Sequence, residues 1–285
     1  MGRAKRNGAE RPAYLTHWGL KEPPFALEPD PRFAYERGDH REAMARVLFG
    51  LTQLGGLVLI TGEIGCGKTT LTQTLRGLLT GAGMRIAEVP NPPRTGAATL
   101  AAVYSAATGT DGVTGTAARL SARLREHAHA PAADGRRLVI VVDEAQRLDA
   151  RALDELRMLT NPEGGPGIAT LLLGQPELSG HVARQPQVAQ RVVVRYHLRP
   201  MGADEVDGYV QHRTRVAGAG RRLFTGRASA ALHAATGGVP RLVNLLGANA
   251  LFVAATRGED QIGADTIHDV ADDRTAAAAR AEGTA

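Results

Sequence analysis

A glycine-rich segment carries the residue types best suited to chemistry in this sequence. Residues 62–69 read Gly-Glu-Ile-Gly-Cys-Gly-Lys-Thr and fit the pattern G-x-x-x-x-G-K-[ST], between an apolar run at 57–60 and a helix-compatible stretch at 68–79. Glycines, which have no Cβ, allow turns in which successive N–H groups point at phosphate oxygens. The helix that follows adds the partial positive charge of its N-terminus. The segment therefore predicts a binding site for a nucleoside triphosphate.

The side chains of this loop have separate predicted roles. Lys68 can reach the β and γ phosphates of ATP, and the Thr69 hydroxyl is placed to ligate Mg²⁺. Only Lys5, Lys21 and Lys68 are lysines among 34 lysines and arginines, so a lysine within the loop indicates function. Cys66 occupies a variable position of the pattern and is expected to fill space. The predicted nucleotide-binding residues are Gly62, Glu63, Ile64, Gly65, Cys66, Gly67, Lys68, Thr69 and Thr70.

Two acidic residues follow a second apolar strand. Residues 138–142 read Leu-Val-Ile-Val-Val and lead directly into Asp143 and Glu144. Because the carboxyl ends of parallel strands face the ligand crevice, these acids should lie near the phosphate loop. Asp143 is then placed to hold the Mg²⁺ shell, usually through water, and Glu144 to orient and polarise a hydrolytic water. The alternative is a pair of acids that only caps a turn, and the phosphate loop makes it the weaker interpretation.

Gln175 follows another buried strand, at 168–173. A polar side chain at that strand end would lie beside the γ-phosphate and could sense it or help to position the water. The alternative is a turn residue that bonds its own backbone.

Two arginines are candidates for charge stabilisation. Arg191 precedes a strand at 192–198 and could reach the γ-phosphate of a neighbouring subunit, or it could simply be exposed to solvent. Arg241 follows Pro240 at the start of a helix and could reach back to the phosphates, or form a salt bridge on the surface. The rivals of Arg191 for its role are Arg184, Arg195 and Arg199.

Composition limits the function classes that need consideration. The chain has 285 residues, 43% of them hydrophobic, and no stretch approaches the length of a membrane span. No secretory signal is visible in residues 1–12, and the one cysteine fits a reducing compartment, so we expect a cytoplasmic protein. A net charge of +5 permits an acidic partner such as DNA or anionic lipid without demonstrating one.

Strand and helix signals alternate in the first two thirds of the chain. This alternation predicts an α/β fold, a mainly parallel five-stranded sheet flanked by helices, followed by a small all-helical domain. The domains expected are a disordered basic N-terminus at 1–13, a nucleotide-binding α/β domain at 14–199, a helical lid at 200–272 and a disordered tail at 273–285. The expected strands are 57–60, 84–89, 138–142, 168–173 and 192–198. The expected helices are 40–54, 68–79, 99–106, 115–128, 149–159, 203–217, 225–236, 239–256 and 264–271.

Together with these residues, five segments resemble the AAA+ ATPases of the ExeA/GspA type, a secretion-associated group related to the TniB and MuB transposition ATPases. The similarity runs from Tyr14 to about Val270. The segments are 14–25 (Tyr-Leu-Thr-His-Trp-Gly-Leu-Lys-Glu-Pro-Pro-Phe), 29–35 (Pro-Asp-Pro-Arg-Phe-Ala-Tyr), 40–43 (His-Arg-Glu-Ala), 174–178 (Gly-Gln-Pro-Glu-Leu) and 238–244 (Gly-Val-Pro-Arg-Leu-Val-Asn). The longer members of this type continue into a membrane segment and a cell-wall-binding domain, which this sequence does not contain.

The resemblance implies an ATPase with ATP and Mg²⁺ as cofactors. It implies a Walker A motif at 62–69, a Walker B motif at Asp143 and Glu144, and sensor 1 at Gln175. It further implies an arginine finger near Arg191, supplied in trans within a homo-oligomer, and sensor 2 at Arg241. The segment that contains Phe33, Tyr35 and His40 would lie near the adenine.

Three roles remain open at this point. The first is a motor, assembly or switch factor for an envelope secretion or polysaccharide system. The second is an ATP-dependent regulator of transposition that binds duplex DNA and a transposase. The third is a signalling switch with little turnover, which the intact Glu144 disfavours.

Overall fold

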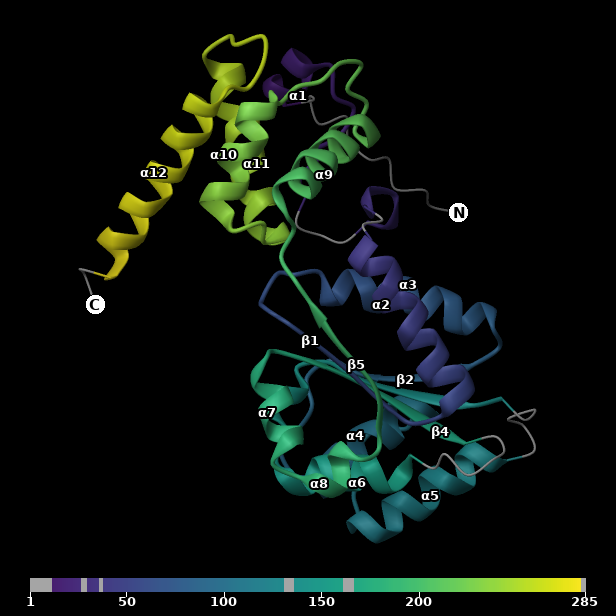
Figure 1. Ribbon diagram of the computed structural model, residues 1–285. Helices are drawn as coiled ribbons and strands as arrows, with labels where there is room; N and C mark the ends of the chain where they lie inside the picture. The colour runs from purple at the N-terminus through teal and green to yellow at the C-terminus, as the bar shows by residue number, and fades with distance from the viewer. Residues whose placement is uncertain (1–11, 27–29, 36–37, 131–135, 161–166, 283–285) are drawn as a thin grey trace. The chain divides into compact units, whose positions relative to one another are not determined.

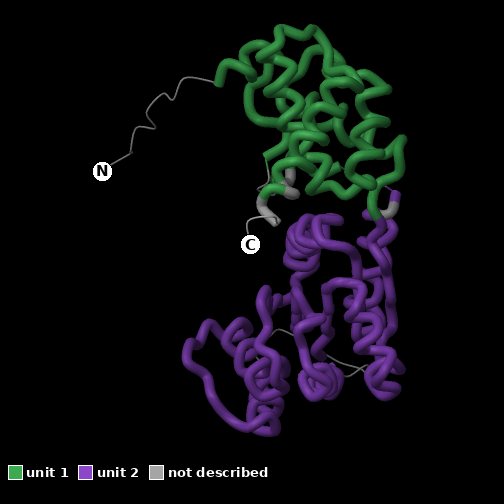
Figure 2. The backbone as a smooth tube through the Cα atoms, turned by 90° about the vertical axis from the view of Figure 1, so that its left-hand side faces the viewer, with its two compact units in different colours: residues 1–35, 200–285 green, residues 36–199 purple. Residues whose placement is uncertain are grey.

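The computed structural model describes residues 12–26, 30–35, 38–130, 136–160 and 167–282, and they form two compact units (Figure 2). The sheet unit comprises residues 36–199, and the helical unit comprises residues 1–35 together with 200–285. Each unit has its own hydrophobic core. The division falls between Arg199 and Pro200, where the strand signals of the sequence stop.

Five parallel strands form the sheet in the order β2-β3-β4-β1-β5, which confirms the predicted fold class. The side chains of β1, β3 and β4 are buried throughout, because helices cover both faces of a parallel sheet. The strand bounds are β1 Leu57–Gly62, β2 Arg85–Val89, β3 Leu138–Val142, β4 Ile168–Gly174 and β5 Val192–Leu198.

Helices lie in two layers on the faces of this sheet (Figure 1). One layer holds α2 (Gly38–Phe49), a π-helical turn at Gly50–Leu54, and α3 (Lys68–Gly81). Their buried side chains pack on one set of alternating strand residues, such as Val58 and Ile60, and the other layer packs on the alternate set. That second layer holds α4 (Gly96–Thr108), α5 (Ala117–His129), α6 (Ala150–Leu159), α7 (Glu177–Ala183) and α8 (Pro186–Ala189).

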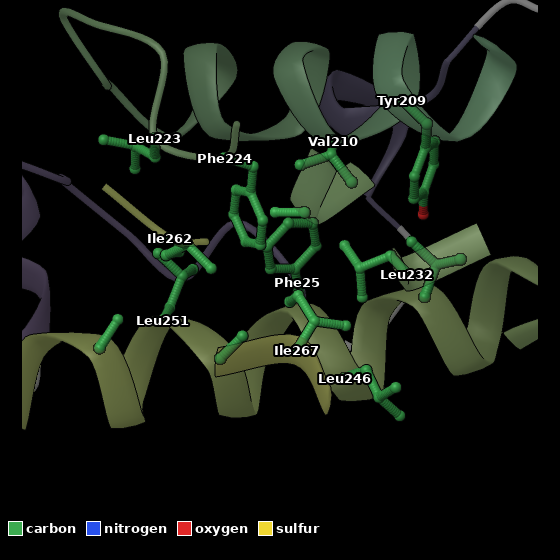
Figure 3. Packing of buried hydrophobic residues seen from close by; sticks show 14 of the residues in the cluster. Phe25, Tyr209, Val210, Leu223, Phe224, Leu232, Leu246, Leu251, Ile262 and Ile267 are labelled. Carbon is green, nitrogen blue, oxygen red and sulfur yellow. The ribbon is translucent and has the colours of Figure 1, made fainter. Parts of the chain in front are cut away.

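The helical unit buries a separate core around Phe25 and Phe224, whose rings meet edge to face at 5.8 Å (Figure 3). Leu232, Leu246 and Ile267 also pack into this core. The helices of this unit are α1 (Ala13–Trp18), a 3-10 turn at Pro31–Phe33, α9 (Ala203–Val216), α10 (Gly226–Thr236), α11 (Pro240–Thr256) and α12 (Ala264–Glu282).

The N-terminal segment differs from its predicted placement, because residues up to Tyr35 group with the helical unit and not with the sheet. Trp18 is buried in the helical core and donates its indole N–H to the carbonyl of Leu251 at 2.8 Å. Arg213 of α9 is also buried, and its guanidinium donates to the Pro24 carbonyl and stacks on the Phe33 ring. A segment with so many buried side chains must fold with the elements that cover them.

The C-terminal end also differs from the expectation of a disordered tail beginning at residue 273. Helix α12 continues to Glu282 because its last turns are rich in alanine, the residue with the highest helix propensity. The disorder expected at 1–13 falls mostly on residues 1–11, which lie outside the described residues, as do residues 283–285. Within the described part of the chain, no helix has the length and apolar character needed to cross a bilayer.

Candidate nucleotide-binding site

The phosphate loop connects β1 to α3 at the carboxyl edge of the sheet. Gly65 and Gly67 have φ angles of 85° and 98°, which only glycine adopts readily, so the predicted loop geometry depends on these two residues. Glu63 and Ile64 project into solvent, whereas Cys66 is buried in the core beneath the loop. Cys66 therefore fills space, as its variable position in the motif indicated.

Lys68 begins α3 and folds back over its own loop. The residue is 7% exposed, and its ammonium donates hydrogen bonds to the carbonyls of Gly62 at 2.6 Å and Glu63 at 3.1 Å. These two neutral acceptors hold a buried cation beside the loop glycines. A phosphate oxygen that entered the loop would offer the same ammonium a charged acceptor, and charge-assisted hydrogen bonds are about twice as strong as neutral ones.

Two close approaches explain why glycines are needed around the loop. A Cβ on Gly67 would lie 3.0 Å from the ring carbon Cε1 of His40, so the imidazole of α2 lies directly against the loop. A Cβ on Gly62 would lie 3.0 Å from the carbonyl oxygen of Leu198. Of the three residues that the resemblance assigns to the adenine region, His40 contacts the loop. Phe33 is buried in the core of the helical unit, and Tyr35 packs against Tyr209 and His212 in that unit.

Asp143 and Glu144 follow β3 at the same edge of the sheet. The backbone N–H of Asp143 donates to the Val89 carbonyl at 3.1 Å, and the Asp143 carboxylate accepts the N–H of Glu144 at 2.8 Å. Burial raises the pKa of the Asp143 carboxyl, while that hydrogen bond and the charge of Lys68 act in the opposite direction. The Lys68 ammonium of the first motif therefore lies close enough to Asp143 of the second to favour its ionised form.

Glu144 has an unusual backbone conformation for a residue with a Cβ. Its φ of 52° and ψ of 33° lie in the left-handed region, and no other non-glycine residue in the described ranges has a positive φ. This conformation costs roughly 1–2 kcal/mol for an L-residue. Backbone strain of this kind is concentrated at functional sites, where the surrounding structure must hold it in place.

The turn after Glu144 contains Gln146, which sequence reasoning missed. The 3-10 turn Ala145–Arg147 brings the Gln146 amide within 2.6 Å of the Glu144 carboxylate oxygen Oε2, to which it donates. The amide oxygen of Gln146 accepts the backbone N–H of Gln175 at 3.1 Å. The only available sequence signal was a polar residue two positions after the acidic pair, and that signal does not identify a partner on another strand.

Gln175 lies at the end of β4, between the two motifs. Strand β4 stands between β3 and β1 in the sheet, and Gly174 pairs in register with Thr61, the residue before Gly62. The Gln175 backbone is therefore level with the start of the phosphate loop. Its backbone N–H donates to the amide oxygen of Gln146, and its carbonyl accepts the N–H of Leu178 at 3.0 Å.

Arg191 lies at the amino end of the strands, whereas the phosphate loop lies at their carboxyl end. Its carbonyl accepts the N–H of Leu57 at 3.1 Å, so its backbone lies beside the first residue of β1. The six residues of β1 place roughly 20 Å between this position and the loop, at about 3.3 Å per residue. The backbone of Arg191 is thus remote from the phosphate site of its own chain.

The rival arginines occupy three different places in the sheet unit. Arg199 follows Leu198, which pairs with Gly62, so its backbone is at the phosphate-loop edge. Arg195 is exposed on β5 and donates to the Ala189 carbonyl at 3.2 Å. Arg184 is exposed and lines a surface cavity of about 580 Å³ that Arg94 and Arg147 also border.

Arg241 belongs to the helical unit, and its side chain is exposed at the first turn of α11. Pro240 begins that helix, as the sequence predicted, because a proline at the first position loses no intrahelical hydrogen bond. A Cβ on Gly238 would lie 1.9 Å from the Met201 carbonyl oxygen, so only glycine allows the chain to enter α11 along this path.

The donor set at the loop fits Mg²⁺, which prefers carboxylate, hydroxyl and water oxygens. The Thr69 side chain is exposed on the first turn of α3, where its hydroxyl is accessible to a ligand. Asp143 supplies a half-buried carboxylate whose raised pKa reflects the cost of burying its charge. A divalent cation would offset that cost.

Part of the sheet unit is similar to a described protein family. Residues 52–181 match the family described as "AAA domain". General secretion pathway protein A of Aeromonas hydrophila is 41% identical over 254 residues, which cover 87% of this chain and 46% of the relative. The chain therefore spans less than half the length of this curated relative.

Solved structures with low sequence identity share the fold. The Aeropyrum pernix ORC2 protein, in ADPNP-ADP complexes, is 17% identical with a TM-score of 0.64, over 87% of this chain and 71% of that chain. Drosophila ORC bound to DNA is 18% identical with a TM-score of 0.66, over 95% of this chain and 68% of that chain. The Thermotoga maritima RuvB Holliday junction branch migration motor is 14% identical with a TM-score of 0.51, over 83% of this chain and 69% of that chain. At such identities the similarity concerns the fold alone.

Proposed function

We propose that this chain is an AAA+ ATPase, which binds ATP with Mg²⁺ and hydrolyses it to ADP and phosphate. The observation that carries the proposal is the convergence of the two motifs at one edge of the sheet. A buried Lys68 lies over a glycine loop, and the strained Glu144 follows a neighbouring buried strand. These are the groups that phosphoryl transfer to water requires, namely a phosphate cradle, a cation and a base.

Each residue has a defined part in the proposed reaction. The loop N–H groups and the Lys68 ammonium bind the β and γ phosphates and stabilise the negative charge that develops on them. The Glu144 carboxylate accepts a proton from the attacking water, whose oxygen forms a bond to the γ-phosphorus as the bond to the bridging oxygen breaks. Mg²⁺, held by Thr69 and through water by Asp143, would supply further neutralisation of the phosphate charge.

Three further residues are proposed for the site. Gln175 is proposed as the sensor of the γ-phosphate, since its strand lies between the two motifs. Arg191 is proposed as the arginine finger of a neighbouring copy, because its backbone is remote from its own loop and a role at the γ-phosphate would have to be in trans within a homo-oligomer. Arg241 is proposed as sensor 2, on the strength of the sequence resemblance at 238–244.

The comparisons favour a role in secretion. The 41% identity to a general secretion pathway protein supports an ATPase that serves an envelope secretion system, and it does not favour the alternative of a DNA-binding transposition regulator. In cells that depend on this protein, its removal should reduce export of secreted proteins. Restoring wild-type protein should recover export, and export that is unaffected by removal would count against this role.

Phosphate release from ATP tests the enzymatic proposal. Wild-type protein should release phosphate in the presence of Mg²⁺, and Lys68→Ala should lose nucleotide binding and turnover because the buried ammonium is absent. Lys21→Ala is the matched control, since Lys21 is an exposed lysine of the helical unit. Equal turnover by Lys68→Ala and wild type would refute the assigned phosphate site.

A further inference from the structure

One side chain bridges the acidic motif and the end of the neighbouring strand. The Gln146 amide nitrogen donates to Oε2 of Glu144 at 2.6 Å, and the Gln146 amide oxygen accepts the N–H of Gln175 at 3.1 Å. Both ends of a single side chain are therefore used, one on the proposed base and the other on the strand end that carries the proposed sensor.

The chemistry of the two partners fixes the orientation of this amide. An ionised carboxylate can only accept a hydrogen bond, and a backbone N–H can only donate one. The amide NH₂ of Gln146 must therefore face Glu144, and its carbonyl oxygen must face Gln175. A flipped amide would leave both contacts repulsive, so the arrangement tolerates one orientation alone.

The local packing leaves Gln146 little freedom. A Cβ on Gly174 would lie 2.7 Å from the Gln146 amide oxygen and 3.2 Å from its backbone nitrogen, so the end of β4 lies directly against this turn. The side chain is partly buried there. Because Glu144 has a left-handed backbone that costs energy, its side chain depends on such neighbours to keep one position.

We propose that Gln146 is a positioning residue for ATP hydrolysis, which holds the Glu144 carboxylate in place and couples it to the end of β4. The inference rests on the proposed function, because it presumes that Glu144 acts on the hydrolytic water. If the γ-phosphate displaced Gln175, the backbone N–H of Gln175 would move, and with it the Gln146 amide oxygen to which it donates. The other end of the same amide would then reorient the carboxylate.

Two variants separate this role from simple support of the turn. Gln146→Leu removes both hydrogen bonds, whereas Gln146→Glu keeps an acceptor for Gln175 but places a second carboxylate against Glu144. We expect both variants to lower kcat about 10- to 100-fold, because displacing a catalytic group by about 1 Å can lower the reaction rate by up to about 100-fold. The KM for ATP should change less than about twofold, since neither variant alters the phosphate loop. The matched control is Gln187→Leu, at an exposed position of α8, which should retain wild-type kcat.

A double-mutant cycle identifies the group through which Gln146 acts. In single-turnover reactions, Gln146→Leu added to Glu144→Gln should slow hydrolysis less than about twofold beyond Glu144→Gln alone. An equal factor in both backgrounds would show that Gln146 acts independently of Glu144 and would overturn the inference. Full activity in Gln146→Glu would also overturn it, because a supporting contact to β4 would then suffice.

The outcomes distinguish this inference from the function on which it rests. Wild-type protein that releases no phosphate would refute the ATPase proposal and the inference with it. Wild-type turnover with an unchanged kcat in Gln146→Leu would refute the inference alone. Thermal unfolding of each variant, followed by circular dichroism, should match wild type. If Gln146→Leu unfolds at a lower temperature than wild type, the kcat of the polar Gln146→Glu variant tests the inference instead.

Discussion

Thr69 and Asp143 offer complementary oxygen donors at the phosphate loop. The Thr69 hydroxyl is exposed at the start of α3, and burial raises the pKa of the Asp143 carboxyl after β3. A buried negative charge near a nucleotide site is stabilised by a cation, and Mg²⁺ accepts both kinds of oxygen. Residue chemistry therefore favours a metal-dependent reaction.

Removing the hydroxyl of Thr69 should weaken this metal dependence in a measurable way. We expect Thr69→Ala to need at least about tenfold more Mg²⁺ for half-maximal ATP turnover, since the loss of a group that only supports a metal ligand already costs about 10- to 100-fold in affinity. The measurement is turnover against Mg²⁺ concentration, with Thr80→Ala, an exposed threonine of α3, as the control. An unchanged Mg²⁺ requirement would exclude Thr69 as a ligand.

At the residue scale, sequence patterns predict what local chain geometry dictates. The spacing of glycines around Lys68 is a property of one short segment, and the structure gives Gly65 and Gly67 the positive φ angles that the loop needs. Gln146 could not be predicted in this way. Its two partners come together only when β3 and β4 pair, and the sequence of residues 143–147 does not indicate which strand will pair with β3.

Helix α9 carries a titratable side chain in a confined place. His212 packs beside Tyr35, and burial lowers the pKa of its imidazole, as do the nearby charges of Arg213 and Arg215, while a backbone contact with Ala34 opposes them. In the unfolded chain the imidazole has its ordinary pKa of about 6.5, and in the folded chain its pKa is lower, so His212 is mainly neutral in both states above about pH 6.5. Below that pH the unfolded chain takes up a proton that the folded chain resists, so acid favours unfolding.

The helical unit should therefore lose stability as the pH falls from 7.5 to 5.5. Urea unfolding at each pH can be followed by the fluorescence of Trp18, the single tryptophan of the sequence, which lies in the core of this unit. We expect His212→Gln to reduce the pH dependence of the unfolding free energy, and His268→Gln, on the exposed side of α12, to leave it unchanged. An identical pH dependence in His212→Gln and wild type would contradict this explanation.

The sequence predicts the strands more accurately than the helices, for a physical reason. Strands such as 138–142 are continuous apolar runs between polar segments, and both of their ends are visible. The short helices α7 and α8 have only seven and four residues, too few for a 3.6-residue period to appear. The end of α12 was misjudged because an alanine-rich segment lacks the apolar side chains that mark a buried face, although its propensity for helix is high.

At the scale of the whole molecule, the assignment of the N-terminal segment depends on contacts that no local pattern contains. Leu15, Trp18 and Phe25 are buried against helices that begin nearly two hundred residues later. Their sequence neighbourhood gives no indication of that partner. The two cores are nevertheless separate, so each unit can be described by its own packing.

A complete site is proposed to need two copies of the chain, and mixing two inactive variants tests this. Arg191→Ala retains the proposed base, and Glu144→Gln retains the proposed finger. When the two are mixed, some subunit contacts should combine an intact Glu144 with an intact Arg191 from its neighbour. We expect part of the wild-type turnover to return in the mixture, measured as phosphate release against mixing ratio. Turnover no higher than the sum of the separate variants would exclude Arg191 as a finger in trans.

The central claim is that the phosphate loop binds ATP and that Glu144 makes its hydrolysis possible. The most direct measurement identifies the nucleotide that remains on the protein after incubation with radiolabelled ATP and Mg²⁺. Wild-type protein should carry ADP, and Glu144→Gln should carry intact ATP at comparable occupancy, because an amide can hold the water but cannot accept its proton. Glu126→Gln, on the exposed face of α5, should behave as wild type. ADP on Glu144→Gln at the wild-type rate, or no nucleotide on the wild-type protein, would contradict the claim.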